Sequence, residues 1–381
     1  MKFYECMRVL NLSLDKAILE KDSPVQKRLL SLAQQMDKLT VLVPGEKDEE
    51  RELSAHLNVY SVSGSKLVQL WKLWRVGKKV LTSRNPSFDL GVGVLPLEKG
   101  ELASFDLITA QDTAYLGLLA YLLARHCKLP LEVQVHGLEK FSGLRMRIAR
   151  HILKKTSRIR VVSERLKQLL ITDYRLSATK IYVLPVITQI TSSEKSYKRK
   201  TVPVPFTFLT VGRLVPVKNI ALQIHAFARL AREYPQVHLR IVGDGPLAAS
   251  LKLQVESLKV QDKVSFEGNQ KELGRQYEEA DAFLLTSDYE GWGRVALEAA
   301  AHGLPIIMTN VGLANEALHH DKECIVIPVG DELQLLGAMQ ELVDKPGLRE
   351  RLGKVAYKTF KSLPGKEEQI RQQVSEWRSL R

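Results

Sequence analysis

Residues 282–301 read A-F-L-L-T-S-D-Y-E-G-W-G-R-V-A-L-E-A-A-A. The apolar start at residues 282–285 predicts a short buried strand, and the turn T-S-D-Y follows it. The apolar pattern resumes at Gly293 and continues to Ala301, which predicts a helix. A strand that leads through a glycine-containing loop into a helix is typical of an α/β fold.

The same alternation of strand-like and helix-like patterns runs through almost the whole chain, which at 381 residues is too long for one typical core. Residues 191–205 interrupt it with a polar, basic and proline-containing segment that is typical of a linker. We therefore predict two doubly wound α/β domains, at residues 1–190 and 206–364, and a last helix at 365–381 that packs back on the first domain. Strands in the first half are expected near residues 8–12, 38–43, 57–62, 107–109, 131–135, 158–162 and 181–184.

The net charge of +13 favours an anionic partner. Nucleic acid, an anionic membrane surface and a phosphorylated small molecule all satisfy this charge, so it does not choose among them. Cys6, Cys127 and Cys324 have neither metal-binding nor disulfide spacing, which favours a reducing cytoplasm. We expect no signal peptide, and the apolar stretch at residues 114–124 is too short to cross a bilayer.

Glu290 and Glu298 place one carboxylate before the expected helix and one within it. Gly291 and Gly293 lack a Cβ atom, so the backbone N–H groups of this loop can approach an anion closely. The stretch therefore predicts a ligand that carries both hydroxyl and phosphate groups, as a nucleotide sugar does.

A second candidate site follows the strand expected at residues 206–211. The sequence T-V-G-R-L-V-P-V-K-N places Gly212 at the sheet edge, with Arg213 and Lys218 after it. Two cations there are suited to hold a diphosphate and to neutralise a departing phosphate. A solvated surface pair is the alternative interpretation.

The sequence I-V-G-D-G-P at residues 241–246 also ends a strand. Gly243 and Gly245 permit a tight turn, and Pro246 is suited to open the next helix. The turn is predicted to line a phosphate or base pocket, and an ordinary connection between a strand and a helix is the alternative.

Four segments taken together resemble glycosyltransferase family 4, a family of retaining transferases with the GT-B fold. They are G-R-L-V-P-V-K-N (212–219), V-G-D-G-P (242–246), V-S-F-E-G (264–268) and E-G-W-G-R-V-A-L-E-A (290–299). The resemblance extends over about residues 206–331 and implies two Rossmann-like domains that face a central cleft.

The resemblance also implies a role for each matching residue. Arg213 and Lys218 would bind the diphosphate of the sugar donor, Glu290 would contact sugar hydroxyls, and Glu298 would accept hydrogen bonds from the ribose. A salt-bridged helix glutamate is the alternative for Glu298, and a solvent-facing side chain is the alternative for Arg294. The remaining implied contacts with the sugar donor are Gly212, Gly243, Asp244, Gly245, Val264, Phe266, Gly291, Trp292, Gly293 and Arg294.

The first domain resembles the family more loosely. In V-Q-V-H-G, residues 133–137, His136 looks like the family histidine that faces the transferred sugar. In R-V-V-S-E-R-L, residues 160–166, Ser163 is expected to cap a helix. Both residues are predicted to border the cleft.

The loop after the first strand departs from the family pattern, because residues 11–24 contain no glycine where many members have a glycine-rich turn. Asp15 and Lys16 are candidates to replace its contacts, although helix capping and solvation explain them equally well. Asp112, after a later strand, is a further candidate on the side of the acceptor.

The implied mechanism is a front-side displacement that retains the configuration of the sugar. Arg213, Lys218 and the helix dipole at Gly293 would stabilise the diphosphate, so we expect no cofactor and no divalent metal. Paired-carboxylate hydrolysis is excluded as the mechanism, because Glu298 lies two helical turns from Glu290. Another GT-B enzyme, such as a nucleotide-sugar epimerase or a glycan phosphorylase, is the alternative. A basic nucleic-acid-binding protein is a weaker alternative that leaves both glutamates unexplained.

Two basic segments suggest where the acceptor is found. Residues 143–167 contain nine Lys or Arg and one acid. In residues 66–84, Trp71 and Trp74 are interleaved with Lys72, Arg75, Lys78 and Lys79. Basic helices with tryptophan favour an anionic membrane surface, whereas a solvated basic face with buried tryptophans is the alternative. We therefore predict a cytoplasmic, peripheral membrane enzyme of cell-envelope polysaccharide synthesis that acts on a glycan or lipid-linked acceptor.

Overall fold

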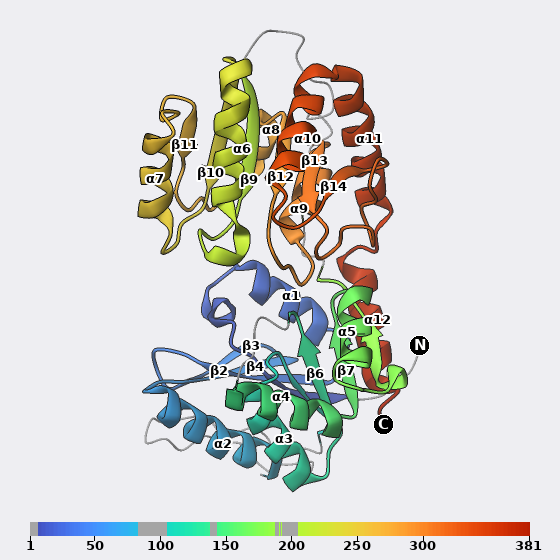
Figure 1. Cartoon of the computed structure of the whole chain (residues 1–381). Coiled ribbons are helices and arrows are strands. Elements are labelled where there is room, and N and C mark those ends of the chain that lie inside the picture. The colour runs from blue at the N-terminus through green and yellow to red at the C-terminus, as the bar shows by residue number, and fades with distance from the viewer. Residues whose placement is uncertain (1–6, 83–104, 138–142, 187–189, 191, 193–204) are drawn as a thin grey trace. The chain divides into compact units, whose positions relative to one another are not determined.

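A computed structural model describes residues 7–82, 105–137, 143–186, 190, 192 and 205–381. The chain forms two compact units (Figure 1). The amino-terminal unit comprises residues 1–188 and 364–381, and the carboxyl-terminal unit comprises residues 189–363. The linker predicted at residues 191–205 lies almost entirely outside the described residues.

The amino-terminal unit is built on an eight-stranded sheet of order β3-β4-β2-β1-β5-β6-β7-β8. All neighbouring strands are parallel except β3 and β4, which are antiparallel. Because the strands between β4 and β8 run in one direction, their carboxyl ends meet at one edge of the sheet. The strands are β1 (Arg8–Leu12), β2 (Lys38–Pro44), β3 (Glu49–Ser54), β4 (Leu57–Val62), β5 (Leu107–Ala110), β6 (Leu131–Val135), β7 (Arg158–Val161) and β8 (Ile181–Val183).

Helices connect these strands and form the apolar core with them. Trp377 and Val374 of the carboxyl-terminal helix α12 are buried in the same core as residues of α1, β1 and β2. The helix at the end of the chain is therefore an integral part of the amino-terminal unit. The helices of this unit are α1 (Pro24–Ala33), α2 (Lys66–Thr82), α3 (Tyr115–Cys127), α4 (Gly143–Lys155), α5 (Glu164–Thr172) and α12 (Lys366–Arg378), with short 3-10 turns at Lys16–Leu19 and Ala178–Lys180.

A buried polar network fixes α12 to the sheet. The Glu132 carboxylate on β6 is fully buried, and it accepts hydrogen bonds from Trp377 Nε1 at 2.7 Å and Tyr182 Oη at 2.6 Å. Thr109 Oγ1 and Gln134 Nε2 also donate to it, at 3.0 and 3.2 Å. A buried carboxylate is costly unless it is hydrogen-bonded, so this network selects one position for α12.

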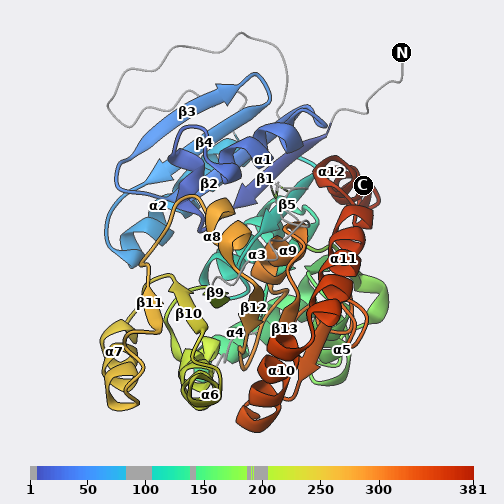
Figure 2. The same ribbon diagram turned by 90° about the horizontal axis from the view of Figure 1, so that it is seen from above.

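The carboxyl-terminal unit contains a six-stranded, all-parallel sheet of order β11-β10-β9-β12-β13-β14. Figure 2 shows α6 and α10 on one face of this sheet and α8 and α9 on the other. The strands are β9 (Phe206–Val211), β10 (Val237–Val242), β11 (Val264–Phe266), β12 (Ala282–Leu285), β13 (Ile306–Thr309) and β14 (Cys324–Ile327). The helices are α6 (Ile220–Glu233), α7 (Ala248–Ser257), α8 (Gly274–Glu279), α9 (Arg294–Ala301), α10 (Glu332–Asp344) and α11 (Pro346–Ser362), with a 3-10 turn at Pro216–Lys218.

The predicted fold class is confirmed, since each unit is a parallel α/β layer with helices between its strands. The sequence did not reveal β3, whose polar residues E-E-R-E-L-S form an antiparallel edge strand with little buried surface. Among the described residues, no helix is long and apolar enough to cross a membrane.

Candidate active site

The predicted residues for binding the sugar donor follow neighbouring strands of the carboxyl-terminal unit. β10, β9 and β12 lie side by side and run parallel, so their carboxyl ends share one edge. Gly212 follows β9, Gly243 follows β10, and the turn that leads to Glu290 follows β12. Three segments that are far apart in the sequence therefore form a single candidate site.

An ion pair lies at the centre of this site. Lys218 Nζ donates to Glu290 Oε1 at 2.5 Å, and Ser287 Oγ donates to the same oxygen at 2.7 Å. The side chains of Lys218 and Glu290 are only 19% and 12% exposed. The pair joins the loop after β9 to the loop after β12, so the two predicted residues are held in contact.

Hydrogen bonds behind the ion pair keep the two loops in register. Gln223 of α6 donates to Thr286 Oγ1 at 2.8 Å, and Thr286 Oγ1 donates to the carbonyl of Asn219 at 3.1 Å. The Asp288 amide donates to the carbonyl of Val217 at 2.8 Å. The site therefore rests on a buried polar scaffold rather than on two independent loops.

Arg213 has a different environment from Lys218. Its side chain is exposed, and it has no ion pair with any described residue. Lys218 is paired with Glu290, whereas the guanidinium of Arg213 is exposed. Arg213 is therefore able to contact a bound diphosphate.

The turn after β10 packs directly against the loop after β9. Gly243 has φ of 134°, and a Cβ atom there would lie 1.9 Å from the carbonyl oxygen of Gly212. The Asp244 side chain is exposed, and its Oδ1 accepts a hydrogen bond from the Gly245 amide at 2.7 Å. The backbone carbonyl of Asp244 accepts from the Leu214 amide at 2.9 Å. Only glycine permits this close approach of two backbones, so Gly243 holds the turn against the loop after β9. Its expected contact with a phosphate or a base stays a prediction.

The strand β11, which contains Val264 and Phe266, borders the turn after β10. The Gly243 amide donates to the carbonyl of Gly268 at 2.7 Å. Phe266 is partly exposed, and Lys252 Nζ lies 5.7 Å from the centre of its ring. An aromatic ring at this edge offers a surface on which a base can stack.

The loop at residues 290–293 is closed by a second glycine contact. The Trp292 carbonyl accepts from the Leu313 amide at 2.8 Å, and a Cβ atom on Gly312 would lie 2.5 Å from that carbonyl oxygen. Gly293 has φ of 86° and is the N-cap residue before α9. Trp292 Nε1 is buried and has no hydrogen-bond partner in the described part of the chain. The backbone around Gly291 is thereby held in one shape ahead of the helix N-terminus.

Glu298 is 8% exposed and is engaged by two side chains. Tyr277 Oη donates to its Oε2 at 2.9 Å, and Arg294 Nε donates to its Oε1 at 2.7 Å. Burial and the neighbouring Glu298 carboxylate raise the pKa of Tyr277 well above its usual value, so the phenol stays protonated. Arg294 is half exposed and forms this ion pair, while the expected contacts of Glu298 with ribose and of Arg294 with phosphate stay predictions.

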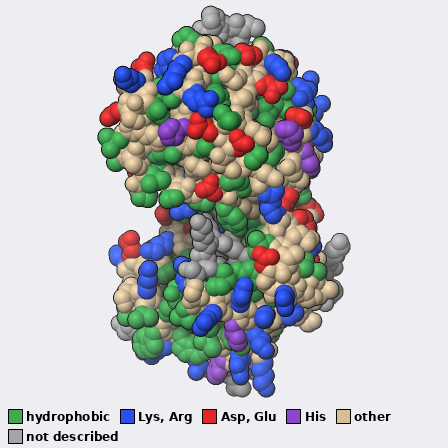
Figure 3. Space-filling model, in the orientation of Figure 1, with side chains coloured by type: hydrophobic (Ala, Val, Ile, Leu, Met, Phe, Trp, Pro, Cys, Tyr) green, Lys and Arg blue, Asp and Glu red, His purple; other side chains and the backbone are tan. Residues whose placement is uncertain are grey.

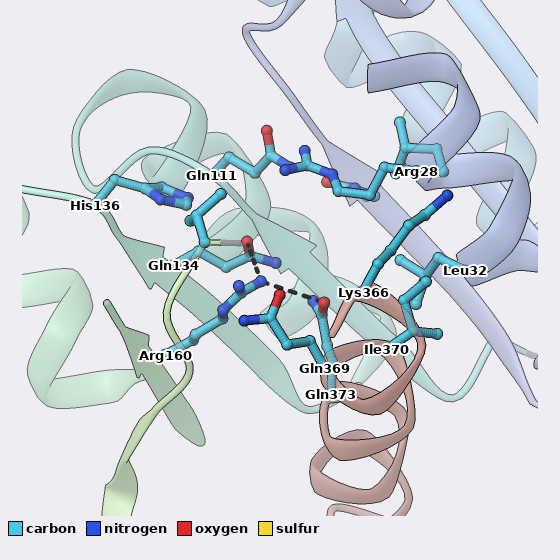
Figure 4. A pocket seen from close by; sticks show the side chains of 13 residues that line it. Arg28, Leu32, Gln111, Gln134, His136, Arg160, Lys366, Gln369, Ile370 and Gln373 are labelled. Atoms are coloured by element: carbon cyan, nitrogen blue, oxygen red, sulfur yellow. Dashed lines mark hydrogen bonds between the residues drawn. The ribbon is translucent and has the colours of Figure 1, made fainter. Parts of the chain in front are cut away.

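In the amino-terminal unit, His136 follows β6 and borders a small pocket that is partly open to solvent (Figure 4). Its ring is solvent-accessible, although protein surrounds it on several sides. This surrounding protein and the positive charges of Arg160 and Arg28 lower the pKa of His136 to about 3. The imidazole is therefore neutral at physiological pH and can donate or accept a hydrogen bond without carrying charge.

The other predicted residues of the amino-terminal unit have local structural partners. Asp15 caps the 3-10 turn by accepting from the Ala17 amide at 3.2 Å, and Lys16 is exposed. Asp112 accepts from the Leu116 amide at the start of α3, at 3.0 Å. Ser163 is confirmed as the N-cap of α5, since its Oγ accepts from the Leu166 amide at 3.2 Å. Their roles toward an acceptor stay predictions.

Several residues of the pocket were not anticipated from the sequence. Arg160 of β7 is buried, and it donates to Gln134 Oε1 at 3.3 Å and to Gln373 Oε1 at 3.2 Å. The only sequence signal was the polar residues Glu132, Gln134 and Arg160 within strands that were otherwise apolar. Gln111, next to Asp112 at the end of a predicted strand, was suggested by the sequence and does line the pocket. The lining residues that the sequence did not suggest are Asn11, Arg28, Leu29, Leu32, Gln134, Arg160, Val186, Lys366, Gln369, Ile370 and Gln373.

Solved structures share this architecture over the full chain. The crystal structure of Anabaena Alr3699/HepE in complex with UDP and glucose superposes with a TM-score of 0.74 at 19% identity, over 98% of this chain and 99% of that one. Sucrose-phosphate synthase from Thermosynechococcus elongatus superposes with a TM-score of 0.76 at 18% identity, over 98% and 99% of the two chains. At these identities the likeness concerns the fold, which is GT-B with two Rossmann-like domains.

Curated relatives match over parts of the chain. The alpha-monoglucosyldiacylglycerol synthase of Streptococcus pneumoniae (strain ATCC BAA-255 / R6) is 29% identical over 279 residues, which are 67% of this chain and 63% of the relative. The lipopolysaccharide core biosynthesis glycosyltransferase LpsD of Rhizobium meliloti (strain 1021) is 29% identical over 157 residues, which are 41% of this chain and 45% of the relative. The matches therefore span less than two thirds of the length of either relative.

Two family models match consecutive parts of the chain. Residues 25–186 match the model described as Glycosyltransferase Family 4, and residues 193–359 match the model described as Glycosyl transferases group 1. The two ranges correspond to the two sheets, and the second contains the ion pair and the glycine turns described above. Together the two models cover most of both halves of the chain, which is therefore a glycosyltransferase similar to those of family 4.

Proposed function

We propose that this protein is a retaining, metal-independent glycosyltransferase that moves a sugar from a nucleotide-diphosphate sugar to a glycan or lipid-linked acceptor. The observation that carries the proposal is the Lys218–Glu290 pair, held where the loops after β9, β10 and β12 meet. Exposed Arg213 and the N-terminus of α9 belong to the same sheet edge. This arrangement provides positive charge for a diphosphate next to a carboxylate for sugar hydroxyls.

In the proposed reaction, an acceptor hydroxyl attacks the anomeric carbon on the face from which the nucleotide leaves. The bond between the anomeric carbon and the diphosphate oxygen breaks, and that oxygen takes the proton of the hydroxyl. Arg213 and Lys218 stabilise the negative charge that develops on the diphosphate. Glu290 orients Lys218 and the sugar. The family resemblance assigns His136 to the transferred sugar, and a neutral imidazole in that role adds no charge.

The identity of the sugar donor is proposed from the same site and from a structural neighbour. The Anabaena protein was crystallised with UDP and glucose, which supports a UDP-linked sugar here. The relatives named for lipopolysaccharide core and diacylglycerol products support an acceptor of the cell envelope.

Hydrolysis of an α-linked nucleotide sugar tests the mechanism without a known acceptor. We expect the sugar first released to be the α-anomer in ¹H NMR spectra recorded before mutarotation, and the rate to be unchanged by a chelator. The Glu290→Gln variant should lose this hydrolysis, while Glu256→Gln, an exposed change on α7 of the same unit, should keep it. Initial release of the β-anomer would refute retention, and inhibition by the chelator would refute metal independence.

We further propose that the enzyme works at the cytoplasmic face of an anionic membrane. Helix α3 contacts both α2 and α4, and none of these three helices contains Asp or Glu. Exposed apolar side chains on them lie among cations, and Figure 3 shows Lys and Arg gathered over α4. These apolar residues are Leu67, Val68, Trp71, Tyr115, Leu122 and Leu144.

Exposed cations and an inserted aromatic ring suit the interface of an anionic bilayer. Trp71 is 55% exposed, and the Arg75 guanidinium lies 4.8 Å from its ring centre. Sedimentation with phosphatidylglycerol vesicles should retain the wild type at low salt, and Trp71→Ser should weaken retention. Leu253→Ser, an equally exposed apolar change on α7, is the matched control. Equal binding to neutral phosphatidylcholine vesicles, or no binding to either, would refute the membrane proposal.

A further inference from the structure

The described residues that line the pocket beside His136 include several cations. Arg28 of α1, Arg160 of β7 and Lys366 of α12 line it together with amide side chains, and no Asp or Glu occurs among the described lining residues. Figure 4 shows Arg28 and Lys366 on one side of the pocket and His136 on the other. All of these residues belong to the amino-terminal unit.

One cation of the lining is paired with a buried carboxylate. The Glu132 carboxylate attracts Arg160, and it also accepts hydrogen bonds from Trp377, Tyr182, Thr109 and Gln134. Among the described lining residues there are three cations and no acid, and a lining of this composition attracts anions.

The amide side chains of the pocket are oriented as hydrogen-bond donors. Gln111 Oε1 accepts from Ser13 Oγ at 2.8 Å, and Gln373 Oε1 accepts from Arg160 at 3.2 Å. In both Gln111 and Gln373, the side-chain carbonyl oxygen accepts a hydrogen bond, and the Nε2 group has no acceptor among the described residues. These assignments follow from the hydrogen-bond network, as amide orientations normally do.

Asn11 gives an independent sign that a polar group is missing from the pocket. It is 1% exposed at the end of β1, it lines the pocket, and its Oδ1 has no hydrogen-bond partner among the described residues. A buried amide without partners is costly, and rotation of the amide exchanges its oxygen for two N–H donors. The buried position thus provides a further donor for a ligand.

We propose that this pocket binds an anionic group of the acceptor, a phosphate or a carboxylate, through Arg28, Lys366, Arg160 and the amides of Asn11, Gln111 and Gln373. The proposal rests on the proposed glycosyltransferase function and adds the chemical class of the acceptor. The place of the pocket beside His136 puts the anchored group next to the residue predicted to face the transferred sugar.

Titration calorimetry of the full chain with inorganic phosphate and with malonate, at constant ionic strength, tests the pocket. We expect saturable binding of at least one anion by the wild type. Tighter binding of phosphate assigns a phosphorylated acceptor, and tighter binding of malonate assigns a carboxylated one. Arg28→Gln combined with Lys366→Gln should weaken binding by at least about tenfold, because it removes two cations.

The matched control is Lys27→Gln combined with Arg371→Gln. It removes the same charge from the same two helices, but at exposed positions outside the pocket lining. Equal weakening by both double variants, or no saturable binding of either anion to the wild type, overturns the proposal. If a nucleotide sugar stabilises the wild type but neither anion binds to it, the pocket proposal is wrong and the proposed function still stands.

Discussion

The Lys218–Glu290 ion pair can be measured directly by a double-mutant cycle with Lys218→Met and Glu290→Gln. The pair is largely buried, with side chains 19% and 12% exposed, and its oxygen also accepts from Ser287. Exposed ion pairs contribute up to about 1 kcal/mol, whereas breaking a fully buried pair costs about 3–5 kcal/mol. This pair lies between the two cases, so we expect each single change to lower the free energy of unfolding by about 2 kcal/mol.

The coupling energy between the two positions isolates their interaction from other effects of each substitution. We expect about 1–2 kcal/mol, measured by urea unfolding monitored in the carboxyl-terminal unit. The matched control is the exposed pair Arg229–Glu332, whose coupling should stay below about 0.5 kcal/mol. A coupling energy at Lys218–Glu290 no larger than that of the control would refute the placement of this pair at the centre of the site.

Three further predictions follow from the described contacts. Gly243→Ala should lower the melting temperature of the carboxyl-terminal unit and abolish its stabilisation by a nucleotide sugar, because the new Cβ would lie 1.9 Å from the Gly212 carbonyl oxygen. Gly274→Ala, where the new Cβ meets no atom within 4 Å, is the control, and similar losses in both variants would contradict the steric argument. Trp377→Phe removes one hydrogen-bond donor from buried Glu132, so we expect a loss of about 1–3 kcal/mol in the unfolding free energy of the amino-terminal unit. The exposed change Trp71→Phe should cost less than about 0.5 kcal/mol, and equal costs would show that the network does not hold α12. His136 has a pKa of about 3 in the folded unit, below its unfolded value, so the folded state binds fewer protons and loses stability as the pH falls below about 6.5. The melting temperature of His136→Gln should fall less steeply than that of the wild type between about pH 6.5 and 4.5, and parallel curves would show that His136 is not shifted.

The carboxyl-terminal site was largely predictable because its chemistry lies in loops with distinctive residues. Gly243, Gly293 and Glu290 stand at strand ends in the sequence, and parallel strands bring those ends to one edge. The contact between Lys218 and Glu290 could not be predicted, since it depends on the order of β9 and β12 in the sheet. Arg294 was similarly ambiguous until its ion pair with Glu298 was located.

The pocket of the amino-terminal unit was not predictable from the sequence for a different reason. Its residues come from β1, α1, β6, β7 and α12 and from the segments that follow β5, β6 and β8, so no local segment contains more than a few of them. The packing of the last helix on the first domain was predicted, but the sequence does not show which of its polar residues, such as Lys366 and Gln373, line a pocket there. Polar residues inside a buried strand, such as Glu132, are the one local sign that such a network exists.

Binding of a nucleotide sugar tests the central claim most directly. A thermal-shift panel of UDP-, GDP- and ADP-linked sugars should identify at least one donor that raises the melting temperature of the wild type with a saturable concentration dependence. Glu290→Ala should abolish the difference between the nucleotide sugar and the free nucleoside diphosphate, because this carboxylate is assigned to the sugar. If no nucleotide sugar in the panel stabilises the wild type, the assignment of this site to a sugar donor is wrong.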